Sequence, residues 1–162
     1  MTLRSVQKKY KRITEKLVDK NISITTMESC TSGFIASLIT DTPGASCIMK
    51  GALVTYSNEA KIKYGVNEET INRYGVYSNE TAFEMARVCR KTFNADIGVG
   101  VTGSFQNTDP ANSDSVIGFV YISLNWNKQA FAMPIKVPKF KTRFEYKLYV
   151  ANKIADELLQ II

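Results

Sequence analysis

A short strand-like run ends in a polar turn that could hold a nucleophile. Residues 22–27 alternate and are rich in β-branched side chains, and residues 34–39 are apolar with helical character; the turn Glu28-Ser29-Cys30-Thr31-Ser32-Gly33 joins them. The first N–H groups of a helix lack partners within the helix and favour negative charge. Ser29 therefore lies where an oxyanion hole or a phosphate site can form. In a second interpretation, Thr31 or Ser32 only caps the helix and Gly33 packs against the sheet.

The histidine and cysteine content restricts the possible chemistry further. The 162 residues include no histidine, which excludes Ser-His-Asp and Cys-His catalysis and removes the commonest zinc ligand. The three cysteines, Cys30, Cys47 and Cys89, show no CxxC spacing, so neither a disulfide framework nor a zinc site is expected. We expect no metal, no cofactor and a reducing, cytoplasmic location.

The rest of the chain alternates between helix and strand patterns. Apolar steps of three and four predict helices over residues 3–19, 79–93 and 144–162, and capping residues predict shorter helices after Ser57 and at Asn67. Strands are expected at 47–56 and 96–102 and in an antiparallel hairpin, 116–126 and 129–137, that turns through 125–128. The sequence predicts one α/β domain over residues 1–162, a three-layer α/β/α sandwich with a mixed β-sheet.

Two segments of the predicted sheet region have competing interpretations. Gly98, Gly100 and Gly103 match a dinucleotide-binding pattern, but they lie within the predicted strand rather than after it, which favours close approach of a neighbouring backbone or a ligand. Residues 104–115 form a long polar stretch rich in Asn, Asp and Ser, and loops of this length are usually functional or disordered.

The net charge of +6 is concentrated at the two ends of the chain. Both ends are predicted helices, so the charge is interpreted mainly as their solvated faces. A basic nucleic-acid-binding module is the lowest-ranked function, because no DNA- or RNA-binding motif lies between the ends. We expect no export signal and no membrane span, because the first residues form an amphipathic pattern and no run of eighteen apolar residues occurs.

Several motifs, taken in order, resemble one family. They are Glu28-Ser29-Cys30-Thr31-x-Gly33, Pro43-Gly44, Gly51-x-x-Val54-Thr55-Tyr56-Ser57-Asn58-x-x-Lys61, Gly65-Val66, Gly75-Val76-x-Ser78 and Val101-Thr102-Gly103. This pattern resembles the C-terminal domain of the competence/damage-inducible CinA family, whose stand-alone members are nicotinamide-mononucleotide deamidases. The resemblance runs from about Ile24 to Val120, and weakly to Arg143.

The resemblance implies a metal-independent amidohydrolase of pyridine nucleotide salvage. It would convert nicotinamide mononucleotide and water to nicotinate mononucleotide and ammonia. The family's catalytic serine falls on Ser29, its lysine on Lys61 and its motif tyrosine on Tyr56. A Ser-Lys pair suits a chain without histidine, provided that burial, and a nearby cation, lower the lysine pKa to about 7 or 8. The expected oxyanion or substrate-binding residues are Cys30, Thr31, Ser32, Gly33, Asn58, Thr102, Gly103 and Arg143.

The chain departs from the family pattern in two places. Ser32 replaces the first glycine of the usual SCTGG, and residues 104–115 replace a loop rich in glycine and proline. An alternative function is therefore a catalytically impaired relative that only binds the nucleotide. Cys30, beside Ser29, is expected to pack rather than react. As partners we expect a small nucleotide substrate and a homo-oligomer, with a dimer favoured, but neither a membrane nor nucleic acid.

Overall fold

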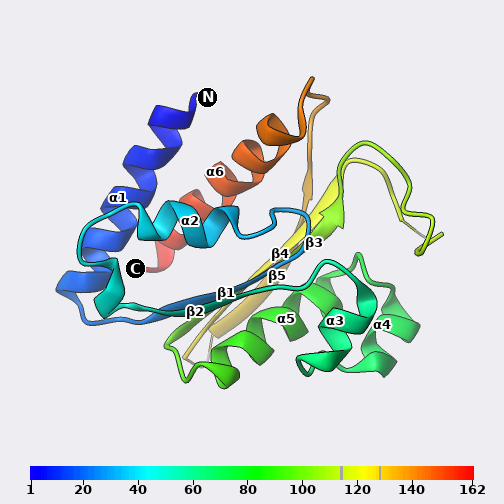
Figure 1. The fold of residues 1–162 in the computed structure, drawn as a ribbon, viewed down its shortest axis with the longest axis horizontal. Helices are drawn as coiled ribbons and strands as arrows, with labels where there is room; N and C mark the ends of the chain where they lie inside the picture. Colours follow the sequence, from blue (N-terminus) through cyan, green and yellow to red (C-terminus); the bar gives the residue numbers. More distant parts are fainter. Residues whose placement is uncertain (114, 128) are drawn as a thin grey trace.

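A mixed five-stranded sheet divides the molecule, with strand order β2-β1-β3-β4-β5 (Figure 1). Strands β2 (Met49–Val54), β1 (Ile24–Glu28) and β3 (Ile97–Ser104) are parallel, whereas β4 (Phe119–Trp126) and β5 (Gln129–Lys136) continue the sheet as an antiparallel hairpin. The computed structural model describes residues 1–113, 115–127 and 129–162. Residue 114, in the predicted long loop, and residue 128, in the predicted hairpin turn, lie outside the described residues.

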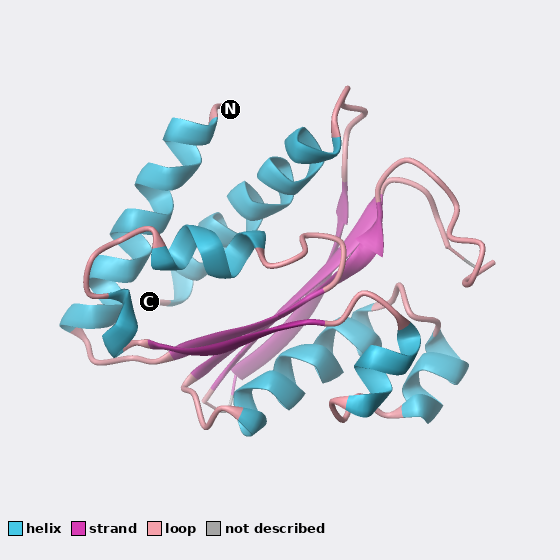
Figure 2. Cartoon of the chain, viewed as in Figure 1, coloured by secondary structure: helices cyan, strands magenta, loops and turns pink. Residues whose placement is uncertain are grey.

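Helices cover both faces of this sheet (Figure 2). Helices α1 (Leu3–Asp19), α2 (Phe34–Thr40) and α6 (Arg143–Ile161) lie on one face, and α3 (Asn58–Lys63), α4 (Glu68–Tyr74) and α5 (Asn79–Thr92) lie on the other. Each face has its own apolar core, the larger beneath α1, α2 and α6. The predicted three-layer α/β/α sandwich with a mixed sheet is confirmed. Among the described residues, no helix is both long and apolar enough to cross a membrane.

The predicted elements are all present, with shifted ends. The strand expected over 47–56 is shorter, because a 3-10 turn at Ala45–Cys47 precedes it and the chain leaves the sheet after Val54. Two caps lie where polar residues predicted them: the side chains of Ser57 and Asn67 accept hydrogen bonds from the first turns of α3 and α4. Ser78, for which the sequence predicted no cap, does the same for α5.

The glycines of β3 allow α5 to pack closely against the sheet. A Cβ atom at Gly98 would lie 2.2 Å from the carbonyl oxygen of Ala86, and one at Gly100 would lie 2.1 Å from that of Ala82. Both distances are far below van der Waals contact. The interpretation of this glycine pattern as close backbone approach is therefore confirmed, and no helix opens directly after it as a dinucleotide site requires.

Candidate active site

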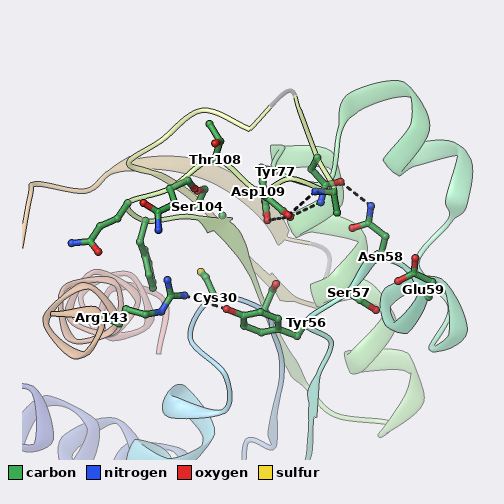
Figure 3. A pocket seen from close by; sticks show the side chains of 17 residues that line it. Cys30, Tyr56, Ser57, Asn58, Glu59, Tyr77, Ser104, Thr108, Asp109 and Arg143 are labelled. Carbon is green, nitrogen blue, oxygen red and sulfur yellow. Dashed lines mark hydrogen bonds between the residues drawn. The ribbon is translucent and has the colours of Figure 1, made fainter.

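A pocket of about 430 Å³ lies where the parallel strands end (Figure 3). The carboxyl ends of β2, β1 and β3 meet at one edge of the sheet, which is where open α/β sheets bind ligands. Ser29 and Cys30 follow β1, Tyr56 to Glu59 follow β2, and Gly103 and Ser104 end β3. The segment after β3 and Arg143 at the start of α6 complete the wall.

Ser29 and Lys61 meet although 32 positions separate them in the chain. The Lys61 Nζ atom lies 3.2 Å from Ser29 Oγ and donates to the Thr55 carbonyl oxygen at 2.9 Å. The Thr55 N–H in turn donates to the Glu28 carbonyl oxygen, which ties the start of the β2–α3 connection to the end of β1. Ser29 lines the pocket, and Lys61 approaches it from within the protein.

The Lys61 side chain is only 1% exposed, although it lies on a six-residue helix. Burial lowers its pKa from the ordinary 10.5 to about 8, because a charged ammonium is poorly solvated there. The neighbouring cation that we expected does not contribute: the groups that act on Lys61 through their charges are acidic, Asp109 and Glu59 among them, and they raise its pKa. Burial alone thus brings the amine close to the range of a general base.

The turn after Ser29 is shaped by two residues in the left-handed region. Ser32 has φ of 53° and Gly33 has φ of 84°, so Ser32 occupies a conformation that suits the family's usual glycine. The Ser32 N–H donates to the Ser29 carbonyl oxygen at 3.0 Å, which closes the turn. Neither residue lines the pocket, so both affect the site through the path of the chain.

Helix α2 is capped by a residue to which the sequence assigned no role. The Glu28 carboxylate is fully buried and accepts hydrogen bonds from the N–H groups of Ile35, at 3.1 Å, and Ala36, at 2.9 Å. No side chain caps the helix from the N-cap position, Gly33. The interpretation of Thr31 or Ser32 as the cap is therefore wrong. A phosphate site at these N–H groups is also excluded, because a carboxylate already occupies them.

Backbone N–H groups that could stabilise an oxyanion are available next to Ser29. Within the described part of the chain, the N–H groups of Cys30 and Thr31 have no protein acceptor, whereas the Ser29 N–H donates to the Val101 carbonyl oxygen. The Thr31 side chain is fully buried, and its hydroxyl has no partner among the described residues. Two free N–H groups directly after a nucleophile are the usual donors to a developing oxyanion.

Tyr56 and Arg143 form a bridge at the pocket mouth rather than contacts with Ser29 and Lys61. Tyr56 is 60% exposed, and its hydroxyl accepts a hydrogen bond from Arg143 Nη2 at 3.1 Å. The Arg143 guanidinium also lies over the Phe105 ring, 5.4 Å from its centre. Figure 3 shows Tyr56 and Arg143 joined beside Cys30. The structure thus places no hydrogen bond from the Tyr56 hydroxyl to Ser29 or Lys61.

The other predicted residues separate into pocket and packing roles. Asn58 and Gly103 line the pocket, and a side chain at Gly103 would meet the Val120 backbone at 2.5 Å. Thr102 does not line the pocket: it is fully buried and donates to the Val76 carbonyl oxygen at 3.0 Å. The Cys30 thiol is buried, which raises its pKa to about 12 and makes it a poor nucleophile, as expected.

The long polar segment contributes residues that sequence reasoning left unassigned. Asp109 lines the pocket and accepts hydrogen bonds from the Tyr77 hydroxyl at 2.7 Å, Asn112 Nδ2 at 2.6 Å and the Ala111 N–H at 3.0 Å. Asn112 in turn accepts from Asn58 at 2.8 Å. The length of the loop was the sequence signal that pointed to Asp109 and Asn112. Tyr77, between Val76 and Ser78 of the motif, had been assigned no role. In the described residues, no three His, Cys, Asp or Glu side chains gather as metal ligands.

Comparison with known proteins points to one family. The model of the CinA C-terminal domain matches residues 6–159. A competence-damage inducible protein of Acetivibrio thermocellus is 45% identical over 109 residues, covering 67% of this chain and 26% of that protein; one of Alkaliphilus metalliredigens is 43% identical over 126 residues, covering 77% and 30%. The chain therefore spans little more than a quarter of the length of these curated relatives.

Solved structures agree on the fold. The competence/damage inducible protein CihA of Agrobacterium tumefaciens superimposes with a TM-score of 0.86 at 25% identity, covering 96% of this chain and 94% of that one. A competence or damage-inducible protein of Enterobacter asburiae gives a TM-score of 0.87 at 25% identity, covering 96% and 97%.

Proposed function

This chain belongs to the CinA C-terminal domain family, and we propose that it is an amidohydrolase that removes ammonia from nicotinamide mononucleotide. The observation that carries the proposal is the buried Lys61 amine, 3.2 Å from the hydroxyl of a pocket-lining serine. Among the described residues no acidic side chain forms a salt bridge with Lys61. Burying a charged amine in this way lowers the stability of the fold, so a chemical role explains why it lies there.

In the proposed reaction, Ser29 Oγ attacks the carboxamide carbon while neutral Lys61 accepts the hydroxyl proton. The tetrahedral oxyanion is held by the N–H groups of Cys30 and Thr31. As the C–N bond breaks, Lys61 returns the proton to the leaving nitrogen and ammonia departs, leaving an ester on Ser29. Water, deprotonated by Lys61, then hydrolyses this ester to nicotinate mononucleotide and free serine.

The proposed site also has a means of holding the nucleotide. Arg143 is a basic side chain that lines the pocket wall. Its guanidinium can donate two hydrogen bonds to a phosphate once it releases the Tyr56 hydroxyl. Tyr56 would then act at the pocket mouth, as a residue that positions substrate, rather than as a proton relay between Ser29 and Lys61.

Ammonia release from nicotinamide mononucleotide tests the proposal. The parent protein should release ammonia, and Ser29→Ala and Lys61→Ala should each lower the rate by at least about 10³-fold, as for nucleophile and base in related catalytic units. Lys63→Ala, on the same helix but exposed, is the matched control and should retain the parent rate.

The alternative function, a relative that only binds the nucleotide, is favoured by one feature. Ser32 and the segment after β3 differ from the family pattern, and that segment forms much of the pocket wall. Tight binding of nicotinamide mononucleotide without ammonia release in the parent protein would support this alternative and contradict the hydrolase.

A further inference from the structure

Charged side chains of both signs line the pocket: Arg143 is basic, and Asp109 and Glu59 are acidic. Arg143 comes from the first residue of α6, and Asp109 comes from the segment between β3 and β4. Figure 3 shows them on opposite sides of Cys30, the residue that follows Ser29. A ligand in this pocket can therefore contact a cation and an anion at the same time.

The Asp109 carboxylate is held in place by several donors. The Tyr77 hydroxyl, Asn112 Nδ2 and the Ala111 N–H all donate to it, and these hydrogen bonds lower its pKa below the ordinary 3.8. Asn112 is itself held by Asn58 from α3. Two carboxylate oxygens offer about four acceptor positions, so three donors fix the group in its ionised form without neutralising it.

This carboxylate does not help the catalytic base. Its charge raises the pKa of Lys61 and so opposes the neutral amine that the proposed reaction needs. A pocket for a neutral amide would gain by lacking Asp109. Its presence, held by three donors, is instead suited to a substrate that brings a positive charge close to the reacting carboxamide.

We propose that Asp109 determines specificity by pairing with the cationic ring of the substrate and selecting it over the same amide on a neutral ring. This inference rests on the proposed function. In nicotinamide mononucleotide the pyridinium ring carries both the carboxamide and the ribose, and the phosphate lies at the far end of the ribose. Asp109 can therefore pair with the ring cation while Arg143 binds the phosphate, since both side chains line the same pocket. The reduced nucleotide keeps carboxamide and phosphate but has a neutral dihydropyridine ring, so it isolates the ring charge.

Binding to the Ser29→Ala variant, measured by titration calorimetry, separates recognition from turnover. This variant should bind nicotinamide mononucleotide on the order of tenfold more tightly than the reduced nucleotide, as expected for one partly screened charge pair. Adding Asp109→Asn should bring the ratio close to one. Glu59→Gln is the matched control: it removes another acidic group that lines the pocket and acts on Lys61, and it should keep the ratio.

The outcomes distinguish this inference from the proposed function. Equal affinities for the two nucleotides in Ser29→Ala overturn the inference even if Asp109→Asn does not fold, and so does a ratio that Asp109→Asn leaves unchanged. If the parent protein releases no ammonia but the ratio is lost only with Asp109, the hydrolase proposal fails while the assignment of Asp109 stands. If the parent protein releases ammonia and Asp109→Asn keeps the preference for the cationic ring, the hydrolase proposal stands while the assignment of Asp109 fails.

Discussion

Replacing Lys61 by methionine should stabilise the protein while abolishing hydrolysis. Methionine fills a similar space without a charge, so the cost of burying the ammonium disappears. The gap between the ordinary pKa of 10.5 and about 8 corresponds to about 3 kcal/mol of unfavourable burial at neutral pH. Loss of the hydrogen bond to the Thr55 carbonyl oxygen lowers the free energy of unfolding by about 1 kcal/mol. The net gain is about 2 kcal/mol.

The stability difference between Lys61→Met and the parent protein should change with pH in a direction that can be checked. Because the pKa of Lys61 is lower in the folded state, the unfolded chain binds more protons between about pH 8 and 10.5, and the stability of the parent protein rises across that range. Below pH 8 both states are protonated and the cost is fully present. The advantage of Lys61→Met should therefore be constant below pH 8 and should shrink above it.

Urea unfolding at pH 6 to 9.5, followed by circular dichroism, measures this difference. A gain of about 2 kcal/mol corresponds to a rise in Tm of about 4 to 8 °C for a domain of this size. Lys63→Met, at an exposed position of the same helix, should change stability by less than about 0.5 kcal/mol. A Lys61→Met protein that is less stable than the parent at pH 7, or an advantage that does not vary with pH, would refute the reasoning.

Three further predictions follow from the same geometry. The kcat/KM for ammonia release should rise with pH and level off above about 8, since the proposed reaction uses Lys61 as a neutral base; a rate that is flat between pH 6 and 9 would contradict that role. Glu28→Gln should cost about 1 to 3 kcal/mol in urea unfolding and lower the ammonia-release rate, because the two hydrogen bonds that Glu28 accepts from α2 fix the turn that carries Ser29; an unchanged midpoint would argue against it. Gly100→Ala should cost at least about 1 to 3 kcal/mol in thermal unfolding, since its Cβ would lie 2.1 Å from the Ala82 carbonyl oxygen, and an unchanged Tm would contradict the close packing of α5.

The elements of the fold could be predicted because local periodicity determines them. The alternation near Ile24 and the three-four spacing in α1 and α6 reflect which side chains face the sheet, and that information is local. The end of β2 could not be placed from the sequence, because Thr55 and Tyr56 still favour a strand, although the pairing of β2 with β1 ends at Val54 and Glu28. Strand ends depend on neighbours that are distant in the chain.

The candidate site was predictable only in part, for the same reason. Ser29 is marked by its position between strand and helix, whereas Asp109 lies in a segment whose composition indicates a loop and nothing about which side chain faces inward. Glu28 belongs to the recognised motif, but only the path of the turn shows that its carboxylate reaches the N–H groups of Ile35 and Ala36. Tyr56 belongs to the motif too, but its hydroxyl accepts a hydrogen bond from Arg143, 87 positions away, which the motif does not indicate.

Lys61 shows most clearly why burial has to be seen rather than inferred. A lysine on a six-residue helix rich in charge is ordinarily exposed, and nothing in the local pattern distinguishes it from Lys63. The difference arises because α3 begins where β2 leaves the sheet, which directs one face of the helix toward the end of β1 and the other toward solvent. The parallel pairing of β1 with β2 thus brings amine and hydroxyl together and excludes water from the amine. The reactivity proposed for Lys61 therefore depends on how β1 and β2 pair. A variant that shifted the β1–β2 register by one residue should lose this reactivity although Ser29 and Lys61 themselves are unchanged.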